Sequence, residues 1–476
     1  MQYSAVGFGS YRIDISIKEH YDALRKSLLS GINVIDTSAN YSDGRSEMLV
    51  GKVITDLISE NKIERKNIIL ITKGGYIQGQ NFKLASSLKK DGKPFSEVVE
   101  FSERLWHCIS PDFLEDQLNR QLFRLNQSYI DVYLLHNPEY FFGKAKDDGL
   151  PLIEAREIFY GRIKKAFEYL EEKAAEGKIL SYGISSNTFN SHSSEYDFTS
   201  LERVLEIAES ISPENHFRVI QFPLNLFEAG AVINKNQHGN SKTLLELSKE
   251  SGLTALVNRP LNAVTSKGLV RLADYKWDAF VEKDFIKQIK LVTLMEEDFL
   301  SEKIASVISD ENDIKKFKSI LNFGKTIDEN WKFFGSIEHY NDMISQIFAP
   351  KISQLITLCG EKFSDESIDE YSGKYINECY RLLNFVSNYY KMKAEKRGRF
   401  IHSLIDKYLD EKYHGLSLSQ KAFLITLSAG GVSCVLAGIR KEKYVDDAIE
   451  ILSQEKIKNA GEIIKFVSEE VEFADR

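Results

Sequence analysis

Cysteine is scarce in this sequence, with four residues among 476. They are Cys108, Cys359, Cys379 and Cys434, and no two of them form a C-x-x-C pair. That spacing argues against a zinc site or an iron–sulfur cluster, and we expect no bound metal. We expect instead buried or partly exposed thiols in a reducing compartment.

The sequence also lacks an excess of positive charge and any apolar run long enough to span a bilayer. Its net charge is -8, with basic and acidic residues interspersed, so we expect no nucleic-acid partner. The first residues do not have the pattern of a signal peptide. We therefore expect a cytoplasmic protein that does not bind a membrane.

What the sequence does contain is the composition of an ordinary globular protein, 43% hydrophobic and 28% charged. Its length suggests one large domain with additions, or two to three domains. Strand-like and helix-like stretches alternate at the spacing of βα units, which favours a parallel sheet or barrel. The expected strands are Ala5–Tyr11, Asn33–Thr37, Asn67–Lys73, Ile130–Asn137, Ile179–Ser185, Phe217–Pro223, Leu253–Val257 and Val432–Ala437. The expected helices are Lys18–Leu29, Ser46–Ile58, a helix after Ser110 reaching Leu125, Arg162–Ala175, Ser200–Ile211, Lys242–Ser251, Ser417–Ser428 and Val445–Leu452.

Eight strands and eight helices are the count of an α/β fold of the (β/α)8 barrel type, the TIM barrel. We assign residues 1–263 and 415–476 to the barrel, and 264–414 to a helical insertion near the C-terminal end of the seventh strand. The stretches Ile376–Lys393 and Phe400–Tyr413 are helix-like, and strand alternation is absent from the insertion. A lid or substrate-selecting role is about as well supported as a solvent-facing appendage or a dimer contact.

Polar side chains end three successive strands: Asp36 ends the second, Lys73 the third and His136 the fourth. Strand C-terminal ends converge on one face of a parallel barrel, so these residues should be neighbours, together with Tyr41 in the loop after Asp36. Taken alone, Asp36 could cap a loop and Lys73 could be solvated. Tyr41 could be a packing residue, and His136 could be a histidine whose hydrogen bonds are satisfied within the fold. Their conjunction is hard to explain by stability, because a buried lysine needs a partner. Asp36 is the natural partner.

These four side chains suggest proton transfer to or from a carbonyl or alcohol. We expect the Lys73 ammonium to lower the pKa of Tyr41 from its usual value of about 10, and Asp36 to keep Lys73 protonated. Tyr41 would then act as general acid or base, and His136 would donate a hydrogen bond to the carbonyl oxygen. No metal or covalent nucleophile is evident, so a bound cofactor would have to supply the hydride.

At this point the sequence strongly resembles the aldo-keto reductase family. The matching segments are D-T-S-A-N-Y-S-D-G-R-S-E-M-L-V-G from Asp36, I-L-I-T-K ending at Lys73, I-D-V-Y-L-L-H-N-P from Ile130 and K-I-L-S-Y-G-I-S-S-N from Lys178. Each motif is weak alone, and together they are highly specific. The resemblance implies an NADP(H)-dependent oxidoreductase, with NAD(H) possible, that interconverts an aldehyde or ketone and its alcohol. It also implies the catalytic tetrad Asp36, Tyr41, Lys73 and His136.

The resemblance implies cofactor contacts at several further strand ends. Gly9 and Ser10 follow the first strand, Ser185 and Ser186 the fifth, and Gln221 lies on the sixth. Where the family often has an aromatic residue after strand seven, this chain has Asn258 followed by Arg259. The segment with Gly438, Arg440 and Lys441 resembles the region that receives the adenosine ribose phosphate, and its two cations could pair with a 2′-phosphate.

Two other functions remain open at the level of the sequence. One is a non-catalytic nicotinamide-binding sensor or scaffold that uses the barrel and the insertion to engage a partner. The other is a barrel lyase or isomerase that binds no nicotinamide. The sequence leaves open which small carbonyl or alcohol, a sugar among them, is the substrate, because pocket-lining loops vary most within a fold. It also leaves open the oligomeric state.

Overall fold

The computed structural model describes residues 2–265, 268–363 and 366–475. The chain divides into two compact units. The first comprises Met1–Leu261, Tyr408–Leu416 and Gln420–Arg476, and the second comprises Asn262–Lys407 and Ser417–Ser419.

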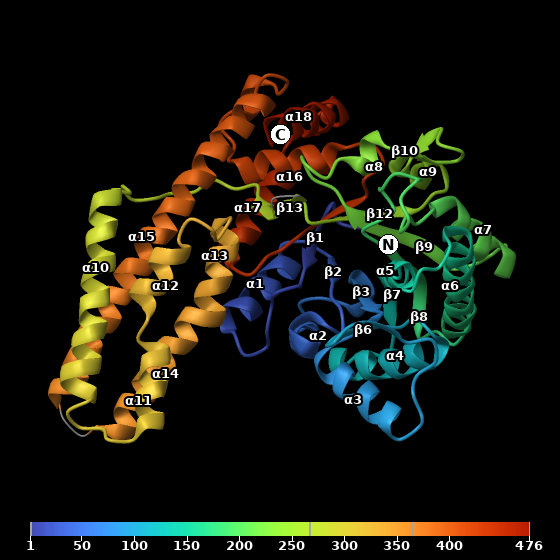
Figure 1. Ribbon diagram of the computed structural model, residues 1–476. Helices are drawn as coiled ribbons and strands as arrows, with labels where there is room; N and C mark the ends of the chain where they lie inside the picture. Colours follow the sequence, from blue (N-terminus) through green and yellow to red (C-terminus); the bar gives the residue numbers. More distant parts are fainter. Residues whose placement is uncertain (1, 266–267, 364–365, 476) are drawn as a thin grey trace. The chain divides into compact units, whose positions relative to one another are not determined.

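Eight parallel strands of the first unit close into a barrel in the order β1-β15-β12-β9-β8-β7-β3-β2 (Figure 1). The strands are β1 (Val6–Gly9), β2 (Val34–Asp36), β3 (Ile69–Gly74), β7 (Ile130–His136), β8 (Ile179–Ser185), β9 (Phe217–Pro223), β12 (Thr254–Asn258) and β15 (Cys434–Ala437). The predicted (β/α)8 barrel is confirmed. Each predicted strand overlaps one of these eight.

The barrel strands form because their residues are apolar on both faces, as parallel strands between a core and an outer helix layer must be. All seven residues of β7 are buried, including Tyr133 and Leu134. Side chains that point into the barrel pack together across it, including those of Val34, Ile71 and Leu256. These residues fill the inside of the barrel, so a reactive site can lie only at the ends of the strands.

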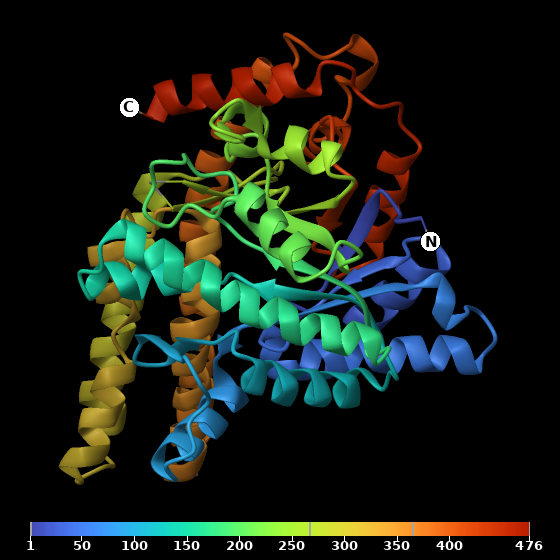
Figure 2. The same cartoon turned by 90° about the vertical axis from the view of Figure 1, so that its right-hand side faces the viewer.

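Helices of the first unit surround the barrel, and Figure 2 gives the same cartoon turned by 90°. They are α1 (Lys18–Leu29), α2 (Arg45–Ser59), α3 (Gly79–Lys90), α4 (Pro111–Leu125), α5 (Tyr140–Asp147), α6 (Leu152–Ala175), α7 (Leu201–Ile211), α8 (Gly230–Ile233), α9 (Leu244–Glu250), α16 (Leu418–Ser428), α17 (Glu442–Leu452) and α18 (Ala460–Asp475). The predicted start of α4 is confirmed, with Ser110 in an extended conformation before Pro111. Its end is set by Asn126, which adopts the left-handed conformation common after a helix.

Some elements of the first unit are absent from the prediction. The loop expected after β3 contains α3 and a three-stranded antiparallel sheet of β4 (Tyr76–Ile77), β6 (Leu105–His107) and β5 (Val99–Ser102). A two-stranded hairpin, β10 (Lys235–Gln237) and β11 (Lys242–Thr243), precedes α9, and α18 follows the barrel. These strands are short, so their periodicity is too brief to recognise.

The second unit is mainly helical and has its own apolar core, which includes Phe285, Val292, Tyr340 and Leu382. Its helices are α10 (Glu282–Asp298), α11 (Glu311–Ile320), α12 (Phe323–Asn330), α13 (Ile337–Met343), α14 (Ala349–Lys362) and α15 (Glu366–Ile405). Helix α10 packs along α15 (Figure 1). Two differences from the prediction are a hairpin of β13 (Asn262–Thr265) and β14 (Gly268–Arg271), and a single helix α15 through Gly398 where two helical stretches were expected.

The four cysteines are free and buried, as expected. Burial raises the pKa of the Cys108 thiol to about 11 and that of Cys379 to about 12, so both are protonated at neutral pH. Within the described ranges, no helix is both long enough and apolar enough to cross a membrane.

Candidate active site

Lys73 lies at the centre of a cluster at the C-terminal ends of the barrel strands. Its side chain is fully buried. The ammonium donates to Asp36 Oδ2 at 2.6 Å, to the carbonyl of Thr37 at 3.0 Å and to Tyr41 Oη at 3.1 Å. An ammonium has three protons, so these acceptors use all of them. The predicted proximity of Asp36, Tyr41 and Lys73 is therefore seen in the structure.

Asp36 is held from its other side by Gln221. The Gln221 amide donates to Asp36 Oδ1 at 2.8 Å, and its carbonyl oxygen accepts from Ser185 Oγ at 3.0 Å and Asn258 Nδ2 at 3.4 Å. The contact with Ser185 follows from strand pairing, because β9 places Gln221 opposite Ser185 on β8. Sequence reasoning missed this link to Asp36, since the two residues are 185 positions apart.

An unusual turn follows Tyr41 and helps to position its side chain. The next three residues, Ser42, Asp43 and Gly44, all have positive φ, at 48°, 55° and 84°. Left-handed backbone costs about 1 kcal/mol or more for a residue with a Cβ, so the turn needs external support. Ser42 Oγ donates to the carbonyl of Ile13 at 2.6 Å, and Asp43 Oδ1 accepts from the N–H of Gln80 at 2.9 Å.

The pKa of Tyr41 differs from the prediction. Burial raises the pKa of Tyr41 above 10, and the opposing effect of the Lys73 ammonium does not overcome it. The predicted lowering of this pKa is wrong, because loss of hydration penalises the phenolate more than one shared cation stabilises it. Burial also disfavours the charged form of Lys73, but Asp36 and Tyr41 outweigh it and raise the pKa of that ammonium. A protonated Lys73 beside a neutral phenol follows.

His136 completes the cluster from the end of β7. Its ring lies 6.0 Å from that of Tyr41 and 4.6 Å from that of Tyr76, centroid to centroid and edge to face in both cases. Nδ1 lies 3.0 Å from Ser38 Oγ. Burial, the Lys73 ammonium and His107 hold the pKa of His136 well below its usual range, so the imidazole is neutral.

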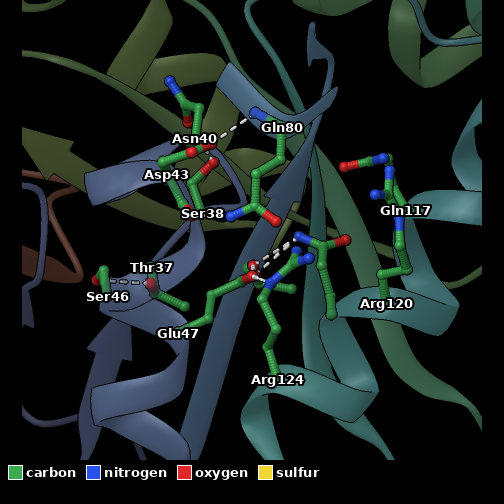
Figure 3. A network of polar contacts seen from close by, with 12 residues as sticks. Thr37, Ser38, Asn40, Asp43, Ser46, Glu47, Gln80, Gln117, Arg120 and Arg124 are labelled. Carbon is green, nitrogen blue, oxygen red and sulfur yellow. Dashed lines mark hydrogen bonds and ion pairs between the residues drawn. The ribbon is translucent and has the colours of Figure 1, made fainter. Parts of the chain in front are cut away.

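A buried network centred on Glu47 supports β3 from the outside (Figure 3). Glu47 Oε1 accepts from Thr72 Oγ1 at 2.6 Å and Gln121 Nε2 at 3.0 Å, and Oε2 accepts from Arg124 Nε at 2.6 Å. Gln121 Nε2 also lies 2.9 Å from the backbone carbonyl of Lys73. The network fixes the strand that carries the lysine.

Comparison with known proteins agrees with this geometry. A model of the Aldo/keto reductase family matches residues 5–231. Those residues belong to the aldo/keto reductase family. The matched residues include β1, β2, β3, β7, β8 and β9, and with them Asp36, Tyr41, Lys73 and His136.

Individual relatives match this chain at low identity. An NADH-specific methylglyoxal reductase of Escherichia coli is 25% identical over 201 residues, which are 40% of this chain and 51% of that protein. An NAD(P)H-dependent D-xylose reductase of Scheffersomyces stipitis is 24% identical over 193 residues, 38% of this chain and 48% of that protein. The chain spans about half the length of the curated relatives it matches. A solved aldo-keto reductase of Bacillus halodurans superposes with a TM-score of 0.47 at 15% identity, covering 98% of this chain and 92% of that one.

The remaining candidate residues of the aldo/keto reductase domain occupy several strand ends. Ser10 is buried, accepts a hydrogen bond from Ser46 Oγ at 2.8 Å, and follows Gly9, whose backbone lies close to Ala437. The Ser186 hydroxyl lies 3.3 Å from those of Thr188 and Thr199, within its own loop. These residues stay predicted cofactor contacts.

The candidates outside the family match lie after β12 and β15. Arg259 has a positive φ of 53° and pairs with Glu228 at 2.6 Å. Gly438, Arg440 and Lys441 lie between β15 and α17, where a Cβ on Gly438 would meet nothing within 4 Å. Lys441 is exposed and lies 3.4 Å from Glu19. This loop is open enough to receive a charged group.

Proposed function

We propose that the chain is an NADP(H)-dependent oxidoreductase that interconverts an aldehyde or ketone and its alcohol, with Tyr41 as general acid or base. The observation that carries the proposal is the hydrogen bond of 3.1 Å between Tyr41 Oη and the buried Lys73 ammonium. A phenol beside a fixed cation can release a proton and leave a stabilised phenolate. The names of the relatives, one a methylglyoxal reductase and one a xylose reductase, support small carbonyl substrates.

In the reduction direction each residue has one task. When bound, a reduced nicotinamide supplies the hydride that the carbonyl carbon receives. Tyr41 gives its proton to the carbonyl oxygen, and Lys73 stabilises the phenolate that remains until solvent reprotonates it. Asp36 keeps Lys73 charged and in place. His136 donates a hydrogen bond to the same carbonyl oxygen, which lowers the energy of the charge developing there.

The residues at the ends of β9 and β12 fit a nicotinamide carboxamide. Asn258 Oδ1 is buried and makes no hydrogen bond within the described part of the chain. A buried acceptor without a donor costs free energy, and the amide N–H₂ of nicotinamide would satisfy it. Gln221 and Ser185 lie beside it. Arg440 and Lys441 would receive a 2′-phosphate, which favours NADP(H) over NAD(H).

Replacement of Tyr41 by phenylalanine tests the catalytic role. We expect Tyr41→Phe to reduce turnover of a carbonyl panel by at least about a hundredfold, because it removes the proton donor. NADPH binding, followed by cofactor fluorescence, should stay within about twofold because the ring is retained. Tyr21→Phe is the matched control, since it deletes a phenol that bonds Asp56 on the barrel exterior. Comparable activity in Tyr41→Phe and Tyr21→Phe would refute the assignment.

Cofactor choice has its own test. Lys441→Ala should weaken NADPH binding by about tenfold and leave NADH binding unchanged, because one charge-assisted contact with the 2′-phosphate is lost. Lys443→Ala removes an exposed lysine two residues along and serves as the control. Equal loss for both cofactors would overturn the assignment of Lys441. NADPH that binds but is never consumed would favour the sensor, and a chain that binds neither nucleotide would favour the lyase or isomerase.

A further inference from the structure

Behind His136 lies a short chain of polar side chains that the proposed mechanism does not use. It begins at His136 Nδ1, which lies 3.0 Å from Ser38 Oγ. Ser38 Oγ lies 2.8 Å from Asn40 Oδ1, and Asn40 Nδ2 lies 3.3 Å from Gln78 Oε1. Ser38 and Asn40 belong to the loop between β2 and Tyr41 (Figure 3). Gln78 immediately follows β4, in the segment that the sequence pattern did not resolve.

The Ser38 hydroxyl has one proton, and its two near partners, Asn40 Oδ1 at 2.8 Å and His136 Nδ1 at 3.0 Å, compete for it ahead of the Lys73 carbonyl at 3.5 Å. If Ser38 donates to Asn40, Ser38 Oγ is left to accept, and His136 must donate from Nδ1–H. A neutral imidazole carries one proton, so Nε2 is then a bare acceptor. If Ser38 instead donates to His136 Nδ1, the proton lies on Nε2, which becomes a donor.

The two amide groups allow both directions. A rotation of 180° exchanges the oxygen and nitrogen of Asn40 and of Gln78 without moving the rest of either side chain. With Gln78 donating to Asn40, Asn40 donates to Ser38, and Ser38 donates to His136. The reversed chain, which the amide orientations in the structure give, runs from His136 outward to Gln78. No other side-chain hydrogen bond in the described residues fixes the orientation of either amide.

We propose that Ser38, Asn40 and Gln78 form a hydrogen-bond chain that sets which nitrogen of His136 carries the proton. The competent direction runs inward from Gln78, so that Nε2–H can donate to a carbonyl oxygen. These three are positioning residues, because they act through His136. The catalytic consequence rests on the proposed carbonyl reduction, whereas the position of the proton does not.

Gln78 allows the chain to be set from its far end. A glutamate at this position can only accept, so Gln78→Glu forces Asn40 to donate outward and drives His136 to the Nδ1–H form. A lysine can only donate, so Gln78→Lys favours the inward direction and the Nε2–H form. Gln78 is partly exposed, so either charge can be hydrated. The two variants form a matched pair of opposite polarity.

The ¹⁵N NMR spectrum of the labelled full-length chain reports which imidazole nitrogen carries the proton. The His136 signals are identified among the nine histidines by their loss in a His136→Gln variant. We expect Nε2–H in the wild type and in Gln78→Lys, and Nδ1–H in Gln78→Glu. We expect kcat for carbonyl reduction to fall about tenfold or more in Gln78→Glu and to stay within about threefold in Gln78→Lys, with smaller changes in KM.

A double variant separates the chain from a simple electric-field effect. Ser38→Ala removes the middle link, so in that background Gln78→Glu should no longer change the position of the proton. The same ¹⁵N spectrum in wild type, Gln78→Glu and Gln78→Lys would overturn the proposal, as would an effect of Gln78→Glu that persists in Ser38→Ala. A wild type without reductase activity would refute the proposed function. The NMR result would still show whether Ser38, Asn40 and Gln78 set the position of the His136 proton.

Discussion

Lys73 and Asp36 form an ion pair closed off from water, with 2.6 Å between Nζ and Oδ2. Removing one partner of such a pair leaves an uncompensated buried charge, which typically costs about 3–5 kcal/mol. We expect Lys73→Met and Asp36→Asn each to lower the free energy of unfolding by that order. The double variant should cost less than the sum of the two, because it leaves no unpaired charge. Urea unfolding of the three variants measures this, and strictly additive losses would contradict it.

The buried carboxylate of Glu47 gives a second stability prediction. Its oxygens accept from Thr72, Gln121 and Arg124. Glu47→Gln replaces one oxygen with an N–H₂ group that must face one of these donors, so we expect a loss of about 2 kcal/mol or more in the free energy of unfolding. Glu64→Gln alters an exposed pair with Lys66 and should change it by less than about 0.5 kcal/mol. Equal effects would show that the network carries no stability.

At the left-handed turn after Tyr41 we expect glycine to be more stable than alanine, the reverse of their order inside a helix. Ser42→Ala and Ser42→Gly both delete the hydroxyl bonded to Ile13. Because glycine adopts positive φ freely, Ser42→Gly should be more stable than Ser42→Ala by about 1 kcal/mol. At Ser87 inside helix α3 the order should be the opposite, with alanine favoured by about 1 kcal/mol. Thermal unfolding of the four variants compares the two sites, and the same order at both would show that the turn is unstrained.

Sequence was sufficient for the barrel because its signals are local. A strand such as β7, which is buried on both faces, is largely a continuous apolar run in the sequence. Ser110 followed by Pro111 is a pattern typical of a helix start. Once the strands are known, barrel geometry brings their ends together, which is why Asp36, Lys73 and His136 could be placed as neighbours.

The rest depends on contacts between distant segments. The bond from Gln221 to Asp36 joins β9 and β2, which are not neighbours in the barrel, so it depends on barrel closure and no local pattern encodes it. The predicted lowering of the Tyr41 pKa was wrong, because the balance between burial and the Lys73 cation depends on how densely the ring is packed. Gln78 belongs to a short-stranded segment whose fold is set by tertiary contacts, so its approach to Asn40 carries no sequence signal.

Glu139, just after β7, carries the pH dependence that the structure predicts most clearly. Its side chain is buried. Oε1 accepts from the N–H of Asn187 at 2.8 Å, while Oε2 is buried and has no hydrogen bond within the described residues. Burial raises the pKa of this carboxyl to about 7, although hydrogen bonding by the Asn187 amide and by the Ser186 side chain opposes the change. Near neutral pH the group is therefore only partly ionised.

The sign of the stability effect follows from proton binding. The folded chain holds the Glu139 proton more tightly than the unfolded chain, where the pKa has its ordinary value of 4.5. The contribution to stability is complete below about pH 4.5 and is lost as pH rises to about 7, where it levels off. Its full size is on the order of 3 kcal/mol.

Glu139→Gln isolates this contribution because glutamine does not titrate and its oxygen can still accept from Asn187. Other groups titrate in both chains, so the informative quantity is the difference in unfolding free energy between variant and wild type. We expect that difference to be near zero at pH 4.5 and to grow to about 3 kcal/mol in favour of the variant at pH 8. Urea unfolding at half-unit pH steps measures it, with Glu64→Gln as an exposed control whose difference should not change. Parallel stability curves for Glu139→Gln and wild type would mean that Glu139 ionises normally in the folded chain, and that its buried oxygen is hydrated.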